Sequence, residues 1–227
     1  MTENTSVSLR ISAVFVLIGF LMTLGLVAVT LLSGDGAQLH EAVDPQTIIN
    51  ELNAASPADL SIRLAGLVFD MFFIVGYVAI FYGLYVLTKS SAPFFPKLAF
   101  VVGLATGFCD LIENAIQLAL FTGIPAGWTP DGLYFASLWT FTFVKDMTSY
   151  TAGMIFIVLL TLSLGTHAEL RLGKSLLIVL LGLYVVLGSL AIIDSSFLLY
   201  RSLSFMFDML LGGILLHRMS RAFEELP

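Results

Sequence analysis

Four polar side chains able to bind a proton or a cation lie within one strongly apolar segment. Residues 100–121 are otherwise apolar enough to span a bilayer, yet they contain Asp110, Glu113, Asn114 and Gln117. A charged side chain at the bilayer centre costs roughly 2.5 to 3.5 kcal/mol even on a lenient insertion scale. Acids are therefore kept at such depth mainly when a partner or a task needs them, and we take this cluster as the candidate functional site.

The four side chains share one face of a helix. At about 100° per residue they fall on a single stripe, together with Gly103 and Gly107. The two glycines form a small-xxx-small pair, which lets a neighbouring helix approach closely and is interpreted as packing. Asp110 and Glu113 are one turn apart, so their mutual repulsion favours binding of a proton by one of them.

Three other apolar segments carry ionisable residues at a similar depth. These residues are Asp70 in the second segment, Lys145 and Asp146 in the fourth, and Asp208 in the sixth. Counting about 1.5 Å per residue from the outer end of each helix puts all of them roughly 12 to 20 Å deep. A shared depth is what a common site requires, so we expect one polar layer near the midplane.

Two arginines precede this layer at matching positions. Arg63 and Arg201 are each followed, after five residues, by Phe-Asp-Met, which includes Asp70 or Asp208. Both arginines are expected about two turns nearer the outer face, where they either reach phosphate head groups or attract an anionic substrate. We assign them to the outer mouth of the site.

Acids outnumber bases in the layer. Even with both arginines counted, five carboxylates face three cationic side chains. An uncompensated buried carboxylate is unfavourable by several kcal/mol, so it should take up a proton or hold a bound cation. The charge balance therefore favours a proton or cation site.

The composition indicates an integral membrane protein. Hydrophobic residues make up 58% of the 227 positions and charged residues 11%, against roughly 25% in soluble domains. Apolar runs use almost the whole length, which predicts one all-α membrane domain over residues 1–227, a polytopic helical bundle with six transmembrane helices. The predicted spans are 11–32, 62–87, 98–121, 133–164, 176–193 and 197–216, with an outer loop at 33–61.

The distribution of charge predicts the orientation. Lys and Arg residues flank alternate ends of the spans, at Arg10, Lys89, Lys97, Arg171, Lys174, Arg218 and Arg221. By the positive-inside rule these ends face the cytoplasm, so both termini are expected inside and the first span is interpreted as retained. Short charged termini without sorting motifs favour a bacterial inner (plasma) membrane. The net charge of −6 and the lack of a basic run exclude nucleic acid as an expected partner.

Helix starts are marked by capping residues. Ser56-Pro57-Ala58-Asp59 predicts a capping box that opens the second span, and Asp44-Pro45 predicts a short surface helix in the outer loop. Thr129-Pro130-Asp131 predicts a cap at Thr129 ahead of the fourth span.

The function expected from these residues is coupling of small-solute transport to binding of a proton or cation. Asp110 and Glu113 form the expected primary site, with Asn114 and Gln117 beside them. Lys145 is the internal counter-charge that a bound ion displaces, and Asp70, Asp146 and Asp208 are supports. A chain of this length could need a homo-oligomer for a complete transport path.

Three alternatives remain open. The chain could be an intramembrane enzyme that uses Asp110 or Glu113 as acid or base on a lipid or isoprenoid. It could be a non-catalytic assembly subunit, or the charges could form an ion-pair network that only joins the helices. The histidines His40, His167 and His217 lie in loops or at an inner helix end, so no histidine-ligated metal site is expected, and Lys145 disfavours a carboxylate-only one. No cofactor is indicated.

Overall fold

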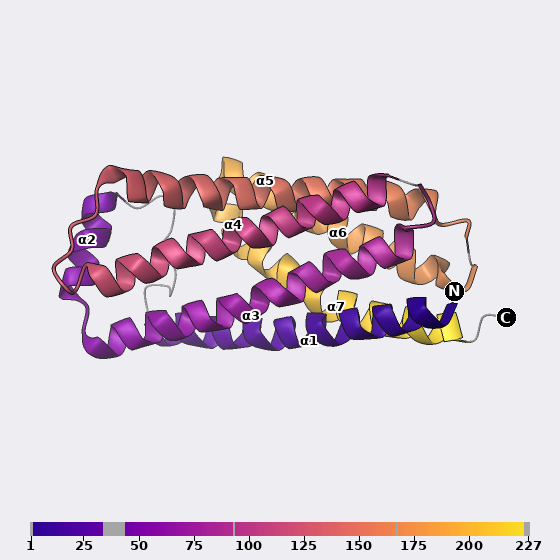
Figure 1. Cartoon of the computed structure of the whole chain (residues 1–227), viewed down its shortest axis with the longest axis horizontal. Helices are drawn as coiled ribbons and strands as arrows, with labels where there is room; N and C mark the ends of the chain where they lie inside the picture. Colours follow the sequence, from indigo (N-terminus) through magenta and orange to yellow (C-terminus); the bar gives the residue numbers. More distant parts are fainter. Residues whose placement is uncertain (1, 34–43, 93, 167, 225–227) are drawn as a thin grey trace.

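The computed structural model describes residues 2–33, 44–92, 94–166 and 168–224. Within these ranges the chain is entirely helical (Figure 1). The α-helices are α1 (Thr2–Ser33), α2 (Pro45–Ala54), α3 (Pro57–Thr88), α4 (Phe95–Gly123), α5 (Gly132–Leu162), α6 (Arg171–Ile193) and α7 (Leu198–Glu224), with short 3₁₀ helices at Ala168–Leu170 and Ser195–Phe197. Six of the described helices are long and apolar enough to cross a membrane, which confirms the predicted all-α bundle at this level.

The six long helices form a closed ring. Each packs against its neighbours in the sequence, in the order α1, α3, α4, α5, α6, α7, and α7 returns to pack against α1. The helices run along the long axis of the molecule, and α1 starts at the same end as α7 finishes (Figure 1). At this end Glu224 accepts a hydrogen bond from Ser6 at 2.8 Å and forms an ion pair with Arg10.

Capping side chains determine where two of the helices begin. At α3, Ser56 Oγ accepts a hydrogen bond from Asp59 N (3.2 Å), and the Asp59 carboxylate accepts one from Ser56 N (3.1 Å). At α2, the Asp44 carboxylate accepts a hydrogen bond from Thr47 N. These bonds satisfy backbone donors that have no partner within the helix, and both predicted starts are confirmed.

The N-cap predicted for the fourth span, Thr129, is wrong by two residues. The N-cap of α5 is Asp131, whose carboxylate accepts a hydrogen bond from Leu133 N at 3.0 Å. Thr129 and Pro130 precede the helix. Asp131 takes the role because its short carboxylate reaches the first free N–H groups directly.

Helix α2 covers the end of the ring that lies opposite the start of α1 (Figure 1). Its Ile48 and Leu52 are buried against apolar side chains of α3, α4 and α5, including Phe121 and Phe135. The part of the predicted outer loop that contains Asp35, His40 and Glu41 lies outside the described residues, as does His167.

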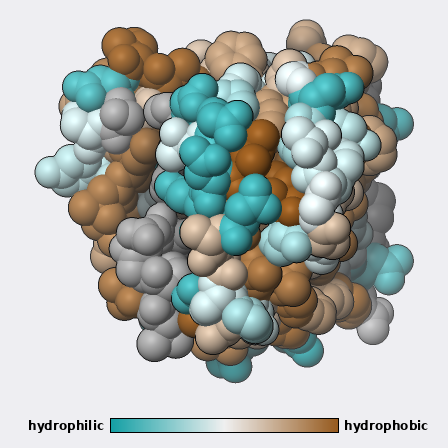
Figure 2. All heavy atoms as spheres, turned by 90° about the vertical axis from the view of Figure 1, so that its left-hand side faces the viewer, coloured by the Kyte–Doolittle hydropathy of each residue, from teal (hydrophilic) through white to brown (hydrophobic). Residues whose placement is uncertain are grey.

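The sides of the bundle are apolar. Every long helix exposes large hydrophobic side chains, for example Leu21, Phe72, Phe108, Val158, Val179 and Leu211. Hydrophilic residues gather instead at the end of the molecule that faces the viewer in Figure 2. Apolar sides with a polar end are the surface distribution of a helical membrane protein.

Helices α1 and α3 approach closely at a pair of glycines. A Cβ atom added to Gly76 would lie 2.6 Å from the Cα of Gly19, and it would also meet the tip of Met209 from α7 at 2.6 Å. Three helices therefore meet at a point where the tip of Met209 leaves no room for a further side chain.

We predict that Gly76→Ala destabilises the bundle, because the new methyl group meets backbone that cannot rotate away. Overpacking of this kind costs about 1–3 kcal/mol. The chain has a single cysteine, Cys109, which is buried in α4, so its reaction with a fluorogenic maleimide on heating reports unfolding. Gly182→Ala in α6 is the matched control, since nothing lies within 4 Å of its added Cβ. Equal unfolding temperatures for the two variants would contradict this packing.

Candidate functional site

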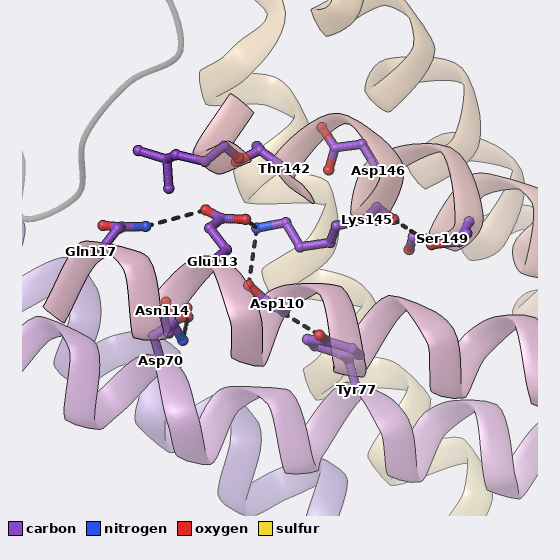
Figure 3. Close-up of polar contacts among 12 residues, drawn as sticks. Asp70, Tyr77, Asp110, Glu113, Asn114, Gln117, Thr142, Lys145, Asp146 and Ser149 are labelled. Carbon is purple, nitrogen blue, oxygen red and sulfur yellow. Dashed lines mark hydrogen bonds and ion pairs between the residues drawn. The ribbon is translucent and has the colours of Figure 1, made fainter. Parts of the chain in front are cut away.

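Lys145 of α5 lies between two carboxylates of α4. Its Nζ is 3.0 Å from the Asp110 carboxylate and 2.6 Å from the Glu113 carboxylate (Figure 3). The two acids are buried, with side chains 5% and 8% exposed, whereas the Lys145 side chain is 21% exposed. One ammonium group therefore compensates two acids that are one helical turn apart.

Each of these acids has a second, neutral partner. Tyr77 of α3 donates its hydroxyl hydrogen to Asp110 at 2.8 Å, and the Gln117 amide donates to Glu113 at 3.2 Å (Figure 3). The tyrosine links a third helix to the contact between α4 and α5. Tyr77 and Asp70 are seven residues apart and so share a face of α3, but Tyr77 was not predicted as a site residue from the sequence.

A third buried carboxylate lies beside this group. The Asn114 amide donates a hydrogen bond to Asp70 at 2.6 Å, and both residues are inaccessible or nearly so (Figure 3). Asp70 has no ion pair among the described residues. We call Asp70, Tyr77, Asp110, Glu113, Asn114, Gln117 and Lys145 the carboxylate cluster.

Glycines and threonines allow α3, α4 and α5 to pack closely beside the cluster. A Cβ added to Gly103 would lie 2.6 Å from the Phe81 ring, and one added to Gly107 would lie 2.8 Å from Val78, so both glycines allow α3 to approach α4. Towards α5, Thr106 donates a hydrogen bond to Thr148 at 3.0 Å. This agrees with the interpretation of the glycines as packing residues.

Two acids expected in the same layer lie apart from the cluster. Asp146 follows Lys145 in the chain but points away from its ammonium group (Figure 3), and forms a 2.7 Å ion pair with Arg201 of α7. Asp208 is buried in α7 without a hydrogen bond or ion pair to any described residue. The expected support residues therefore divide among three places in the ring.

The arginines assigned to the outer mouth have different surroundings. Arg201 is committed to Asp146, whereas the guanidinium of Arg63 lies over the Phe121 ring, 5.9 Å from its centroid. Arg63 is 9% exposed, so it packs within the bundle near α2. Neither arginine contributes an ion pair to the carboxylate cluster.

The cluster thus holds three carboxylates and one ammonium group, and two amide oxygens are left over. Asn114 Oδ1 and Gln117 Oε1 are buried without a hydrogen-bond donor among the described residues. No group of three His, Cys, Asp or Glu side chains that could hold a metal ion is found in the described part of the chain. The arrangement can accept positive charge, as a proton on a carboxylate or as a cation that competes with Lys145.

We predict that Lys145→Met destabilises the protein strongly, because it leaves Asp110 and Glu113 facing each other without a cation. Removing one partner of a buried pair costs about 3–5 kcal/mol. Adding Asp110→Asn to Lys145→Met should recover part of this loss, and Lys97→Met, at an exposed lysine, serves as the control. The measurement is the unfolding temperature reported by Cys109. Additive effects of the two substitutions would show that the pair does not interact.

Comparison with protein-family models, curated proteins and solved structures finds no match to this chain. What the chain does must therefore be inferred from its own residues. The feature that bears most directly on function is the excess of buried carboxylates over ammonium groups in the carboxylate cluster.

Proposed function

We propose that this chain is a six-span protein of the bacterial inner membrane whose carboxylate cluster binds a proton or a small cation to couple transport of a small solute. The observation that carries the proposal is the charge imbalance at Asp70, Asp110 and Glu113, for which Lys145 is the only cationic partner among the described residues. Buried carboxylates without compensation are unfavourable by several kcal/mol. Positive charge taken from outside the protein removes this cost.

The two unpartnered amide oxygens support the same reading. Asn114 and Gln117 each use their N–H group on a carboxylate, so their oxygens remain free to accept from a water, a hydronium ion or a cation. A buried polar group without a partner costs about 1–3 kcal/mol. A cluster that served only to join helices would have no use for these acceptors.

Lys145 provides a means of coupling. A proton or cation that binds at Asp110 or Glu113 weakens the attraction of that acid for the ammonium group, which is the main polar contact between α4 and α5 at this level. Since Lys145 is partly exposed, it can turn outward when released. Asp146, on the same helix, is tied to Arg201, so a movement of α5 would pull on α7. Ion binding would thus change how two pairs of helices pack.

The orientation proposed is with both termini in the cytoplasm. Arg10, Lys89, Lys97, Arg171 and Arg218 all lie near the end of the ring where α1 starts, and Asp44, Glu51, Asp131 and Asp194 lie near the other. An excess of Lys and Arg marks the cytoplasmic side. The carboxylate cluster would then lie between the two surfaces, with α2 on the periplasmic side.

We predict that a carboxyl group of the cluster binds and releases a proton in the purified protein, seen as a protonated C=O stretch in infrared difference spectra on stepping the pH. Glu113→Gln and Asp110→Asn should each reduce or shift this band, whereas Glu51→Gln, at an exposed acid of α2, should not. If a cation binds instead, adding Na⁺ or K⁺ should diminish the protonated band at constant pH.

A different outcome of this infrared experiment would contradict the coupling function. Spectra in which all three acids remain ionised down to acidic pH, with only the carboxylate bands present and no effect of either cation, would contradict the proposal. The cluster would then be a structural ion-pair network, and the coupling function would be wrong.

We also predict the sidedness of two loops. In a Cys109→Ser background, Ser90→Cys between α3 and α4 should react with a membrane-impermeant maleimide only in inside-out vesicles. Ala126→Cys between α4 and α5 should react only in right-side-out vesicles. Both positions are exposed. Reaction of both from the same side would contradict the proposed topology.

A further inference from the structure

Asp208 is the one acid of the expected layer that is both buried and without a polar partner. Its side chain lies on α7 with 8% of the residue exposed, and no described residue forms a hydrogen bond or ion pair with it. Ser204, one turn earlier on the same face, also has a buried hydroxyl without a partner. The carboxylate cluster does not account for either residue.

Both residues border a groove on the side of the bundle. The groove lies between α6 and α7, has a volume of about 380 Å³, and is otherwise lined by leucines and by the rings of Tyr200 and Phe207. This volume lies in the range of about 300–1,000 Å³ that is usual for small-molecule sites. Asp208 also lines an inner apolar cavity of about 30 Å³, next to Tyr77 and Tyr184. The carboxylate therefore lies where the groove meets the interior.

The groove is open on the apolar outer surface of the bundle, the surface that would face lipid. Leu183, Tyr200, Phe207 and Leu211 are each more than two-fifths exposed on the apolar side surface. A ligand can therefore enter from a lipid phase as well as from water. Asp208 is ten residues after the first residue of α7, which places it about 15 Å along the helix from its N-terminus. That depth is beyond the reach of lipid head groups.

We propose that the groove between α6 and α7 binds a lipophilic organic cation, with the charge beside Asp208. A single carboxylate in an apolar groove attracts a positive charge, and the surrounding rings and leucines suit a ligand whose charge is covered by apolar groups. Ser204 offers a hydroxyl to a polar substituent. Arg201, about two turns before Asp208 in α7, does not oppose the cation because its charge is paired with Asp146.

This site is separate from the carboxylate cluster, and its occupancy does not depend on the coupling function. The two are nevertheless close neighbours through Tyr77, which donates to Asp110 and also lines the inner cavity beside Asp208. An organic cation in the groove would be well placed to act as the solute whose movement the cluster couples.

The test is binding of radiolabelled tetraphenylphosphonium to the purified protein in neutral detergent, measured by scintillation proximity. Wild type should bind it saturably, and Asp208→Asn should weaken binding at least tenfold. Glu51→Gln removes the same charge from an exposed position on α2 and should leave binding unchanged. Radiolabelled tetraphenylborate has the same shape and the opposite charge, so in a separate assay without the phosphonium it should not bind saturably.

A second variant keeps the test decisive if Asp208→Asn does not fold. Leu211→Trp retains the carboxylate but fills the groove from an exposed position, and it should also abolish binding. Equal affinity in wild type and Asp208→Asn, undiminished binding in Leu211→Trp, or saturable binding of tetraphenylborate by itself would each overturn the assignment. The infrared titration of Asp110 and Glu113 is independent of all these outcomes.

Discussion

The contact of one ammonium group with two carboxylates is the constraint on which the rest of the bundle depends. Lys145 satisfies Asp110 and Glu113 only if α4 and α5 stay at a fixed separation, and Tyr77 extends this requirement to α3. Asp70 adds a third acid, which has no ion pair among the described residues. The proposed function rests on this fixed geometry together with the attraction of an uncompensated buried acid for positive charge.

The ring of helices explains how such a site is tolerated. Apolar residues cover the sides of all six long helices, and close contacts such as that between Gly19 and Gly76 keep the helices tightly packed around it. Polar side chains can then be shielded inside without breaking the helical hydrogen bonding on which any segment in a bilayer depends. The second charged pair, Asp146 with Arg201, repeats this arrangement between α5 and α7.

Much of the fold could be predicted because its determinants are local. Runs of apolar residues, the capping box at Ser56 and the Asp44-Pro45 pair act within a few residues of where they occur, and each is found as expected. The polar stripe of α4 also follows from helical periodicity alone. The cap predicted at Thr129 is wrong because the chain offers two capping residues, Thr129 and Asp131, separated only by Pro130, and Asp131 is the one next to the first turn.

The contacts between helices could not be predicted in the same way. Depth along a helix follows from counting residues, but the direction in which a side chain points around a ring does not. Counting residues predicts Asp146 and Asp208 at the depth of Asp110, yet one faces α7 and the other a groove beside α6. The matching Phe-Asp-Met sequences illustrate this limit, since Asp70 meets Asn114 whereas Asp208 has no partner among the described residues.

The most direct test of the central claim is a count of protonated carboxyl groups at neutral pH, by ¹³C NMR of protein labelled at Asp and Glu side chains. At least one protonated or cation-sensitive signal that disappears in Asp70→Asn, Asp110→Asn or Glu113→Gln is the expected result. Fully ionised signals from all three, insensitive to Na⁺ and K⁺, would contradict it.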